Sequence, residues 1–215
     1  VIILLVLVII LLILFIPSRT SPIEGDNSLA YIQGIELGGV KQYIMVRSKD
    51  INNPILLFLH GGPGYAQISY ASKYQSDLED NFIVVNWDQR GAGKSYSPNI
   101  PKESMTREQF IKDGIELINY LIKEYGKEKI FLVGHSWGSD LGLHIVDKYP
   151  EKIAAFVSIG QVVDGQRQEK ISYEYVMDMA KGENNQKALQ ELSSIGHPPY
   201  NDMVKDIHTQ RKWLA

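Results

Sequence analysis

A serine between two glycines is the part of the sequence best suited to covalent chemistry. Ser136 stands in the stretch Gly134-His-Ser-Trp-Gly138, the nucleophile-elbow pattern G-x-S-x-G. The apolar run 130–133 before it predicts a buried strand, and the spacing of apolar residues over 137–149 predicts a helix behind it. A tight turn between strand and helix holds a serine hydroxyl where it can attack a carbonyl carbon.

Acyl transfer through a serine also needs hydrogen-bond donors for the oxyanion that forms. The N–H of the residue after the nucleophile, Trp137, is one expected donor. The other is expected from the glycine-rich stretch His60-Gly-Gly-Pro-Gly64, which follows the apolar run 55–59. Glycines let the backbone approach a substrate closely, and Pro63 stiffens the turn, so the N–H of Gly62 is the expected second donor.

The sequence between residues 29 and 160 predicts strands and helices that would hold these groups in place. Two β-prone runs joined by Gly38-Gly39 predict a hairpin, and a long helix is predicted from a capping box at Thr106 and Gln109. Alternation of strands and helices predicts an α/β fold with a mostly parallel sheet and helices on both faces. The strands are expected at 29–37, 40–47, 55–59, 82–87, 130–133 and 153–159, and the helices at 65–80, 106–125 and 137–149.

The pattern of apolar residues changes after Gly160. Three polar helical segments, 166–180, 185–195 and 201–215, follow without another buried strand. We therefore expect a core domain at 29–160 and a separate helical subdomain at 161–215.

Composition excludes several classes of protein. The chain has 215 residues, of which 44% are hydrophobic and 22% charged, and its net charge is −3. This balance gives no electrostatic reason to expect a nucleic-acid partner. There are no cysteines, so disulfides and thiolate metal sites are excluded. No metal or other cofactor is expected, and composition does not predict the oligomeric state.

The first residues have a different character from the rest. Every residue from 1 to 16 is apolar, and residues 17–28 are rich in Pro, Ser, Gly and Asp. A helix of this length would span about 24 Å, close to the hydrocarbon thickness of a bilayer. We therefore expect an N-terminal transmembrane helix at 1–16 and a linker at 17–28. The expected localisation is a single-pass membrane protein with its catalytic domain on the extracytoplasmic side.

Three motifs in this order carry a resemblance to a known family. They are His60-Gly-Gly-Pro-Gly64, Asp88-Gln-Arg-Gly-Ala-Gly-Lys-Ser95 and Gly134-His-Ser-Trp-Gly-Ser139. Together they resemble the α/β-hydrolase superfamily, and specifically its proline iminopeptidase-like branch. The resemblance implies a serine hydrolase that releases an N-terminal residue, proline above all, from small peptides without a metal. Asp88 and Arg90 are expected to brace the loop after their strand.

The resemblance also assigns roles to individual residues. Ser136 matches the nucleophile of the family, and Gly62 and Trp137 fall at its oxyanion-hole positions. The helical region after Gly160 corresponds to its cap, where acidic side chains hold the free amino group of the substrate. Glu169 and Glu174 are the candidates for that substrate-binding role.

Two departures from the family pattern leave alternatives open. His135 stands where the proline iminopeptidase pattern has glycine, and G-H-S-x-G also occurs in esterases and other small-acyl hydrolases. None of the five histidines fits the base of a triad, because the family takes its acid and histidine from strands beyond the cap. We therefore expect both to lie beyond Ala215, which would leave this C-terminally truncated chain inactive. The alternative from another class is a catalytically inactive surface or binding protein.

Overall fold

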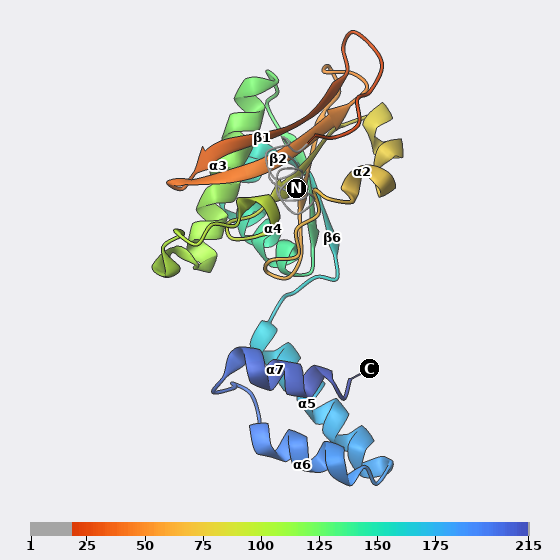
Figure 1. The fold of residues 1–215 in the computed structure, drawn as a ribbon, viewed down its shortest axis with the longest axis vertical. Coiled ribbons are helices and arrows are strands. Elements are labelled where there is room, and N and C mark those ends of the chain that lie inside the picture. Colours follow the sequence, from red (N-terminus) through yellow and green to blue (C-terminus); the bar gives the residue numbers. More distant parts are fainter. Residues whose placement is uncertain (1–18, 215) are drawn as a thin grey trace, which may run out of the picture. The chain divides into compact units, whose positions relative to one another are not determined.

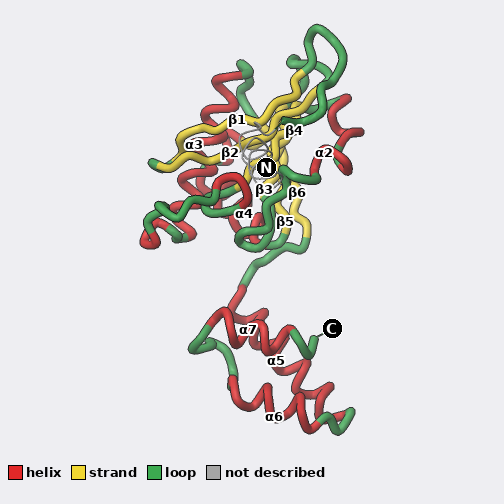
Figure 2. The backbone as a smooth tube through the Cα atoms, in the orientation of Figure 1, coloured by secondary structure: helices red, strands yellow, loops and turns green. Residues whose placement is uncertain are grey.

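The computed structural model describes residues 19–214, with no description of the side chains of residues 203 and 204. The chain divides into two compact units, with the boundary between Gln161 and Val162. All strands of the described chain belong to the first unit, and the second contains helices α5 to α7 (Figures 1 and 2).

The first unit is built on a six-stranded sheet with the order β1-β2-β4-β3-β5-β6. The hairpin β1–β2 and the pairing of β2 with β4 are antiparallel, and the other three pairings are parallel. The sheet is therefore mixed, with its parallel part formed by β4, β3, β5 and β6. The strands are β1 (Leu29–Leu37), β2 (Val40–Ser48), β3 (Ile55–Leu59), β4 (Ile83–Asp88), β5 (Ile130–His135) and β6 (Ile153–Ile159).

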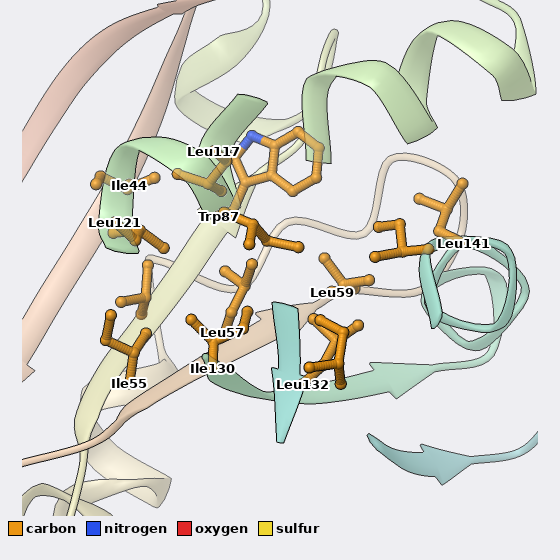
Figure 3. Packing of buried hydrophobic residues seen from close by; sticks show 14 of the residues in the cluster. Ile44, Ile55, Leu57, Leu59, Trp87, Leu117, Leu121, Ile130, Leu132 and Leu141 are labelled. Carbon is orange, nitrogen blue, oxygen red and sulfur yellow. The ribbon is translucent and has the colours of Figure 1, made fainter. Parts of the chain in front are cut away.

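Two helices cover one face of this sheet and a short one packs on the other. The covering helices are α3 (Arg107–Glu124) and α4 (Trp137–Lys148), whose apolar residues form one buried cluster with β2 to β6, around Trp87 (Figure 3). Alternate residues of β2 point to opposite faces, so Met45 instead packs with Ala71 of α2 (Ala71–Tyr74). This packing on both sides of the strands fixes the positions of the strand ends.

Local signals predicted α3 well and the segment before β4 poorly. Thr106 is the N-cap of α3 and accepts a hydrogen bond from the N–H of Gln109 at 3.2 Å, as the capping box predicts. The helix expected over 65–80 is wrong in extent, because α2 has only four residues and a 3₁₀ turn, Ser76–Asp80, follows it. Residues 65–70 of that segment are loop and turn.

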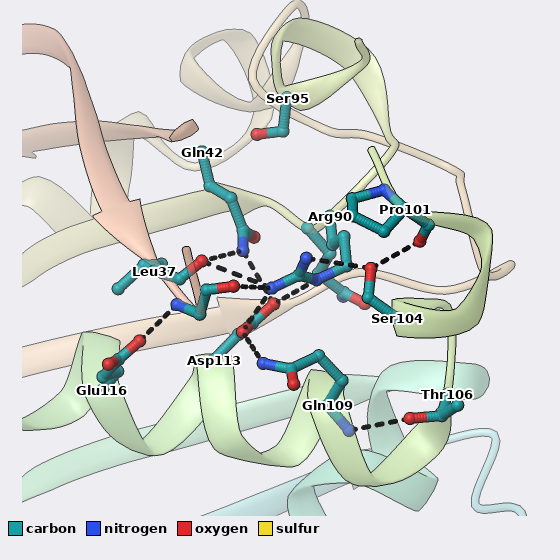
Figure 4. A network of polar contacts seen from close by, with 12 residues as sticks. Leu37, Gln42, Arg90, Ser95, Pro101, Ser104, Thr106, Gln109, Asp113 and Glu116 are labelled. Carbon is teal, nitrogen blue, oxygen red and sulfur yellow. Dashed lines mark hydrogen bonds and ion pairs between the residues drawn. The ribbon is translucent and has the colours of Figure 1, made fainter. Parts of the chain in front are cut away.

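A buried ion pair joins the hairpin, the loop after β4 and α3. Arg90 donates from Nε to Asp113 Oδ2 at 2.8 Å and from Nη2 to Asp113 Oδ1 at 2.9 Å. Both side chains are almost fully buried, at 1% and 0% exposed. Gln42 and Gln109 donate to the same carboxylate, and the carbonyls of Leu37 and Gly38 accept from Arg90 (Figure 4).

The second unit has its own small core. Its helices are α5 (Gly165–Gly182), α6 (Gln186–Ile195) and α7 (Met203–Arg211). Each is preceded by an N-cap Asp or Asn whose side chain accepts a hydrogen bond from a backbone N–H. Tyr173, Val176 and Leu192 lie at the centre of its buried apolar cluster. The residues of this unit therefore have a core independent of the sheet.

The expectation of an N-terminal membrane anchor is corrected. Residues 1–16 lie outside the described residues, so their predicted helix has no structural support. Within residues 19–214, no helix is both long and apolar enough to cross a membrane. The longest, α3 and α5, have 18 residues each, but charged side chains interrupt both of them. The single-pass membrane localisation is therefore unsupported as well.

Candidate active site

The corner between β5 and α4 holds Ser136 in a strained conformation. Its φ is 52° and its ψ is −116°, a region that residues other than glycine rarely occupy. The N–H of Ser136 donates to the carbonyl of Ile159 at 2.8 Å, and Ser139 donates from its N–H and hydroxyl to the carbonyl of Ser136. These bonds tie the corner to β6 and to the first turn of α4, so the strain is held by the surrounding fold.

The two glycines of the elbow are required by close backbone contacts. A Cβ at Gly134 would collide with the carbonyl of Gly138, and a Cβ at Gly138 would collide with the backbone of Leu59. Side chains at these positions would push α4 away from β5 and β3. The spacing of the motif therefore reflects a helix that packs directly against two strand ends.

Gly138 is the residue of the elbow at which α4 lies close to the backbone of β3. We expect Gly138→Ala to lower the free energy of unfolding by about 1–3 kcal/mol, because the carbonyl of Leu59 must move. Gly182→Ala is the matched control, since a Cβ at that helical glycine meets no atom within 4 Å apart from the neighbouring backbone of its own helix. Urea unfolding monitored by circular dichroism would measure both, and equal stabilities would contradict the contact.

The glycine-rich loop lies next to the elbow. β3 and β5 are parallel neighbours with Leu59 opposite Gly134, so the loop after β3 and the corner after β5 share one edge of the sheet. A Cβ placed on Gly61 would lie 3.2 Å from Cβ of Ser136 and 3.1 Å from Nδ1 of His135. The structure therefore brings together two predicted parts of the site that are more than 70 residues apart in sequence.

Both predicted oxyanion donors belong to this edge. Gly62 has a φ of +116°, and a Cβ there would lie 2.6 Å from the backbone nitrogen of Gly64. Trp137 is the first residue of α4, where backbone N–H groups lack helical partners. Within residues 19–214, no hydrogen bond is donated by the N–H of Gly62 or by that of Trp137. Neither N–H group is therefore committed to another partner in the described part of the chain.

His60 is a buried part of the loop scaffold. Its side chain is 1% exposed, its Nδ1 lies 2.8 Å from the carbonyl of Gly61, and its Nε2 accepts from the N–H of Gln89 at 3.1 Å. These partners require a neutral ring with the proton on Nδ1. Burial lowers the pKa of His60 below its ordinary value of 6.5, because it disfavours the charged form.

The lowered pKa of His60 gives a pH prediction with a definite sign. The unfolded chain binds a proton near pH 6.5, whereas folded His60 binds it only at lower pH. Above pH 6.5 His60 is neutral in both the folded and the unfolded state, so neutral His60 costs the fold nothing. As the pH falls below 6.5, the unfolded chain takes up the proton first, and the free energy of unfolding decreases by at most about 1.4 kcal/mol per pH unit. Urea unfolding of the wild type and His60→Gln at several pH values would test this, and identical slopes would contradict it.

The two acidic candidates differ in their surroundings within the second unit. Glu169 pairs through Oε1 with Nη2 of Arg211 at 2.5 Å, and its buried Oε2 has no hydrogen-bond partner among the described residues. It lines a cavity of about 420 Å³ together with Tyr200, whose buried hydroxyl is also unpaired in that part of the chain. Glu174 is exposed on α5. Glu169 is therefore the more enclosed of the two candidates.

Comparison with known proteins identifies the family. A family model described as alpha/beta hydrolase fold matches residues 54–193, which include the glycine-rich loop, the elbow and the start of the second unit. The chain belongs to the α/β-hydrolase family. The resemblance inferred from the three motifs is therefore confirmed.

Curated relatives of this α/β hydrolase include peptidases. A probable aminopeptidase, YbaC, from Bacillus subtilis is 39% identical over 86% of the chain and 58% of its own length. A proline iminopeptidase from Lactobacillus helveticus is 28% identical over 55% of the chain and 40% of its own length. The chain thus spans between two fifths and three fifths of the lengths of these relatives.

Solved structures support the fold. A proline iminopeptidase-related protein from Thermus thermophilus superposes with a TM-score of 0.59 at 22% identity, over 79% of this chain and 58% of that one. The epoxide hydrolase VrEH1 from Vigna radiata gives 0.53 at 26% identity, over 66% and 43%. Because neighbours of different activity share the scaffold, the fold alone does not select the reaction.

The base of a triad is missing from the described site of this α/β hydrolase. Within residues 19–214, no histidine forms a hydrogen bond with the hydroxyl of Ser136. His60 is held by the loop, and His144 lies on α4 at 3.8 Å from Asp140. The elbow and the glycine-rich loop therefore lie side by side, and no histidine of residues 19–214 is hydrogen-bonded to Ser136.

Gln89 is the residue of the site that sequence reasoning missed. It lies directly after β4, is 0% exposed and bonds to both the glycine-rich loop and Trp137. Asp88 and Arg90, its neighbours in the motif, brace loops as expected: Asp88 accepts from the N–H groups of Ile68 and Lys94. The sequence did carry a signal for Gln89: it is a polar residue at the end of a buried strand, between the two residues predicted to brace that loop.

Proposed function

We propose that this protein is a serine hydrolase of the aminopeptidase type, with Ser136 as its nucleophile. The observation that carries the proposal is the strained corner at Ser136 beside a glycine-rich loop, with the N–H groups of Gly62 and Trp137 unpaired within the described residues. An elbow of this kind presents a hydroxyl to a carbonyl carbon and amide protons to the developing oxyanion.

The proposed reaction proceeds through an acyl-enzyme. Ser136 Oγ attacks the carbonyl carbon of the scissile bond as a base accepts its proton, and the carbonyl oxygen becomes an oxyanion held by Gly62 and Trp137. Each such donor contributes about 10²- to 10³-fold to turnover. The amine leaves with a proton, and water then releases the acyl group. The base in this proposal is not one of the histidines of residues 19–214, none of which bonds to the hydroxyl of Ser136.

The proposed substrates are small peptides with a free N-terminus, proline being favoured. Relatives named aminopeptidase and proline iminopeptidase support this class. In this proposal Glu169 Oε2 accepts a hydrogen bond from the protonated amine of the substrate. The exposed Glu174 has no part in it. An esterase on the same scaffold remains the second candidate, because His135 departs from the proline iminopeptidase pattern.

Substrate preference of the whole protein tests the proposal. We expect faster hydrolysis of proline-β-naphthylamide than of p-nitrophenyl acetate, and labelling of Ser136 by a fluorophosphonate probe. A strong preference for the ester would favour the esterase. Failure of the probe to label Ser136 would favour a catalytically inactive binding protein.

Glu169 and Glu174 provide a matched pair of variants for the amine-binding role. We expect Glu169→Gln to raise KM for proline-β-naphthylamide by about 10-fold or more, because a charge-assisted hydrogen bond is lost. Glu174→Gln should leave KM within about twofold, as expected for an exposed side chain. Hydrolysis of p-nitrophenyl acetate, which has no amine, is the internal control. An equal effect of Glu169→Gln on both substrates would contradict amine recognition.

A further inference from the structure

Gln89 connects the two backbone segments that carry the proposed oxyanion donors. Its side-chain Nε2 donates to the carbonyl of His60 at 3.0 Å, and its Oε1 accepts from the indole Nε1 of Trp137 at 3.1 Å. Its own N–H donates to Nε2 of His60 at 3.1 Å. One fully buried residue after β4 therefore bonds to the loop after β3 and to the first residue of α4.

We propose that Gln89 is a positioning residue that sets the spacing between the N–H groups of Gly62 and Trp137. The inference rests on the proposed function, since it assigns a purpose to the geometry of the oxyanion site. Gly62 lies two residues from the carbonyl that Gln89 holds, and the indole that Gln89 holds belongs to Trp137 itself. A shift of Gln89 therefore moves both donors.

The carboxamide is suited to this position because it both donates and accepts. Its Nε2 satisfies a carbonyl and its Oε1 satisfies an indole N–H, whereas a carboxylate could only accept. The ring of Trp137 is also held by Phe110 of α3, with ring centroids 5.7 Å apart and an interplanar angle of 88°. Phe110 and Gln89 together restrict the rotation of the indole, so movement of the first turn of α4 is limited.

A second tryptophan–glutamine pair in the same core provides a control that distinguishes an effect on donor positions from an effect on stability. Nε1 of Trp87 donates to Oε1 of Gln42 at 3.0 Å, and both residues are buried. This bond has the same chemistry as the one between Trp137 and Gln89 but belongs to the network at the hairpin and α3. Trp87→Phe therefore removes an equivalent hydrogen bond away from the proposed donors.

The experiment compares Trp137→Phe, Gln89→Glu and Trp87→Phe in the whole protein. Trp137→Phe removes the indole N–H that donates to Gln89 and keeps the backbone N–H of position 137. Gln89→Glu removes the side-chain N–H that donates to the carbonyl of His60. We expect each to lower kcat for proline-β-naphthylamide by about 10- to 100-fold with KM changed less than threefold, because small displacements of catalytic groups cost rate. Trp87→Phe should lower stability and leave kcat within about twofold.

Amide hydrogen exchange at Tyr65 and Ala66, whose N–H groups donate to the carbonyls of Gly61 and Gly64 in the glycine-rich loop, provides a readout that does not depend on turnover. We expect exchange in this loop to become at least about tenfold faster in Gln89→Glu and to stay unchanged in Trp87→Phe. Unchanged exchange in Gln89→Glu overturns the proposal whatever the activity. Faster exchange with unchanged kcat overturns its catalytic part. If Ser136→Ala retains the activity of the wild type, the proposed function fails and the exchange experiment still decides whether Gln89 holds the loop.

Discussion

Replacing Ser136 by alanine is expected to lower kcat for proline-β-naphthylamide by about a millionfold in the whole protein. The physical reason is the loss of the only group in the proposal that forms a covalent bond to the substrate. The donors of Gly62 and Trp137 would remain, so binding and oxyanion stabilisation account for the residual rate. Steady-state kinetics with a sensitive fluorescent product would measure the change.

Ser158→Ala is the matched control for this prediction. Ser158 lies opposite Gly134 in the pairing of β5 with β6 and is exposed, and its hydroxyl donates to Gln161 at 2.5 Å. Its loss should leave kcat within about twofold, as surface substitutions have small effects. If Ser136→Ala keeps more than a hundredth of the wild-type rate while folding normally, Ser136 is not the nucleophile.

Asp113→Asn is expected to lower the free energy of unfolding by about 3–5 kcal/mol, because it leaves the buried guanidinium of Arg90 without a counter-charge. Four side-chain hydrogen bonds converge on the Asp113 carboxylate from Arg90, Gln42 and Gln109. An asparagine of the same shape would direct an NH₂ group at some of these donors. Urea denaturation at pH 7 would measure the loss.

The exposed ion pair of Lys49 and Asp80 is the control for this effect. Its atoms are 2.5 Å apart, comparable to the buried pair, but the side chains are 57% and 51% exposed. Asp80→Asn should therefore cost less than about 1 kcal/mol. Similar losses in the two variants would show that burial is not what makes the Arg90–Asp113 pair important.

The sequence by itself was sufficient for the features that depend on neighbouring residues. Apolar runs marked β3 to β6, and Thr106 with Gln109 marked the start of α3, because capping and strand burial are expressed over a few positions. The spacing of Gly134, Ser136 and Gly138 likewise predicted a corner between strand and helix. The three motifs were enough to identify the family. The apolar residues 1–16 led to a membrane prediction that no described helix supports.

Only the tertiary structure decided how these parts meet. The adjacency of Gly61 and Ser136 depends on the pairing of β3 with β5, and the bonds of Gln89 depend on β4 lying on the other side of β3. The mixed sheet depends on β2 pairing with β4. These contacts join residues tens of positions apart. They arise because packing of the whole sheet against α3 and α4 selects one strand order, which no local pattern of residues expresses.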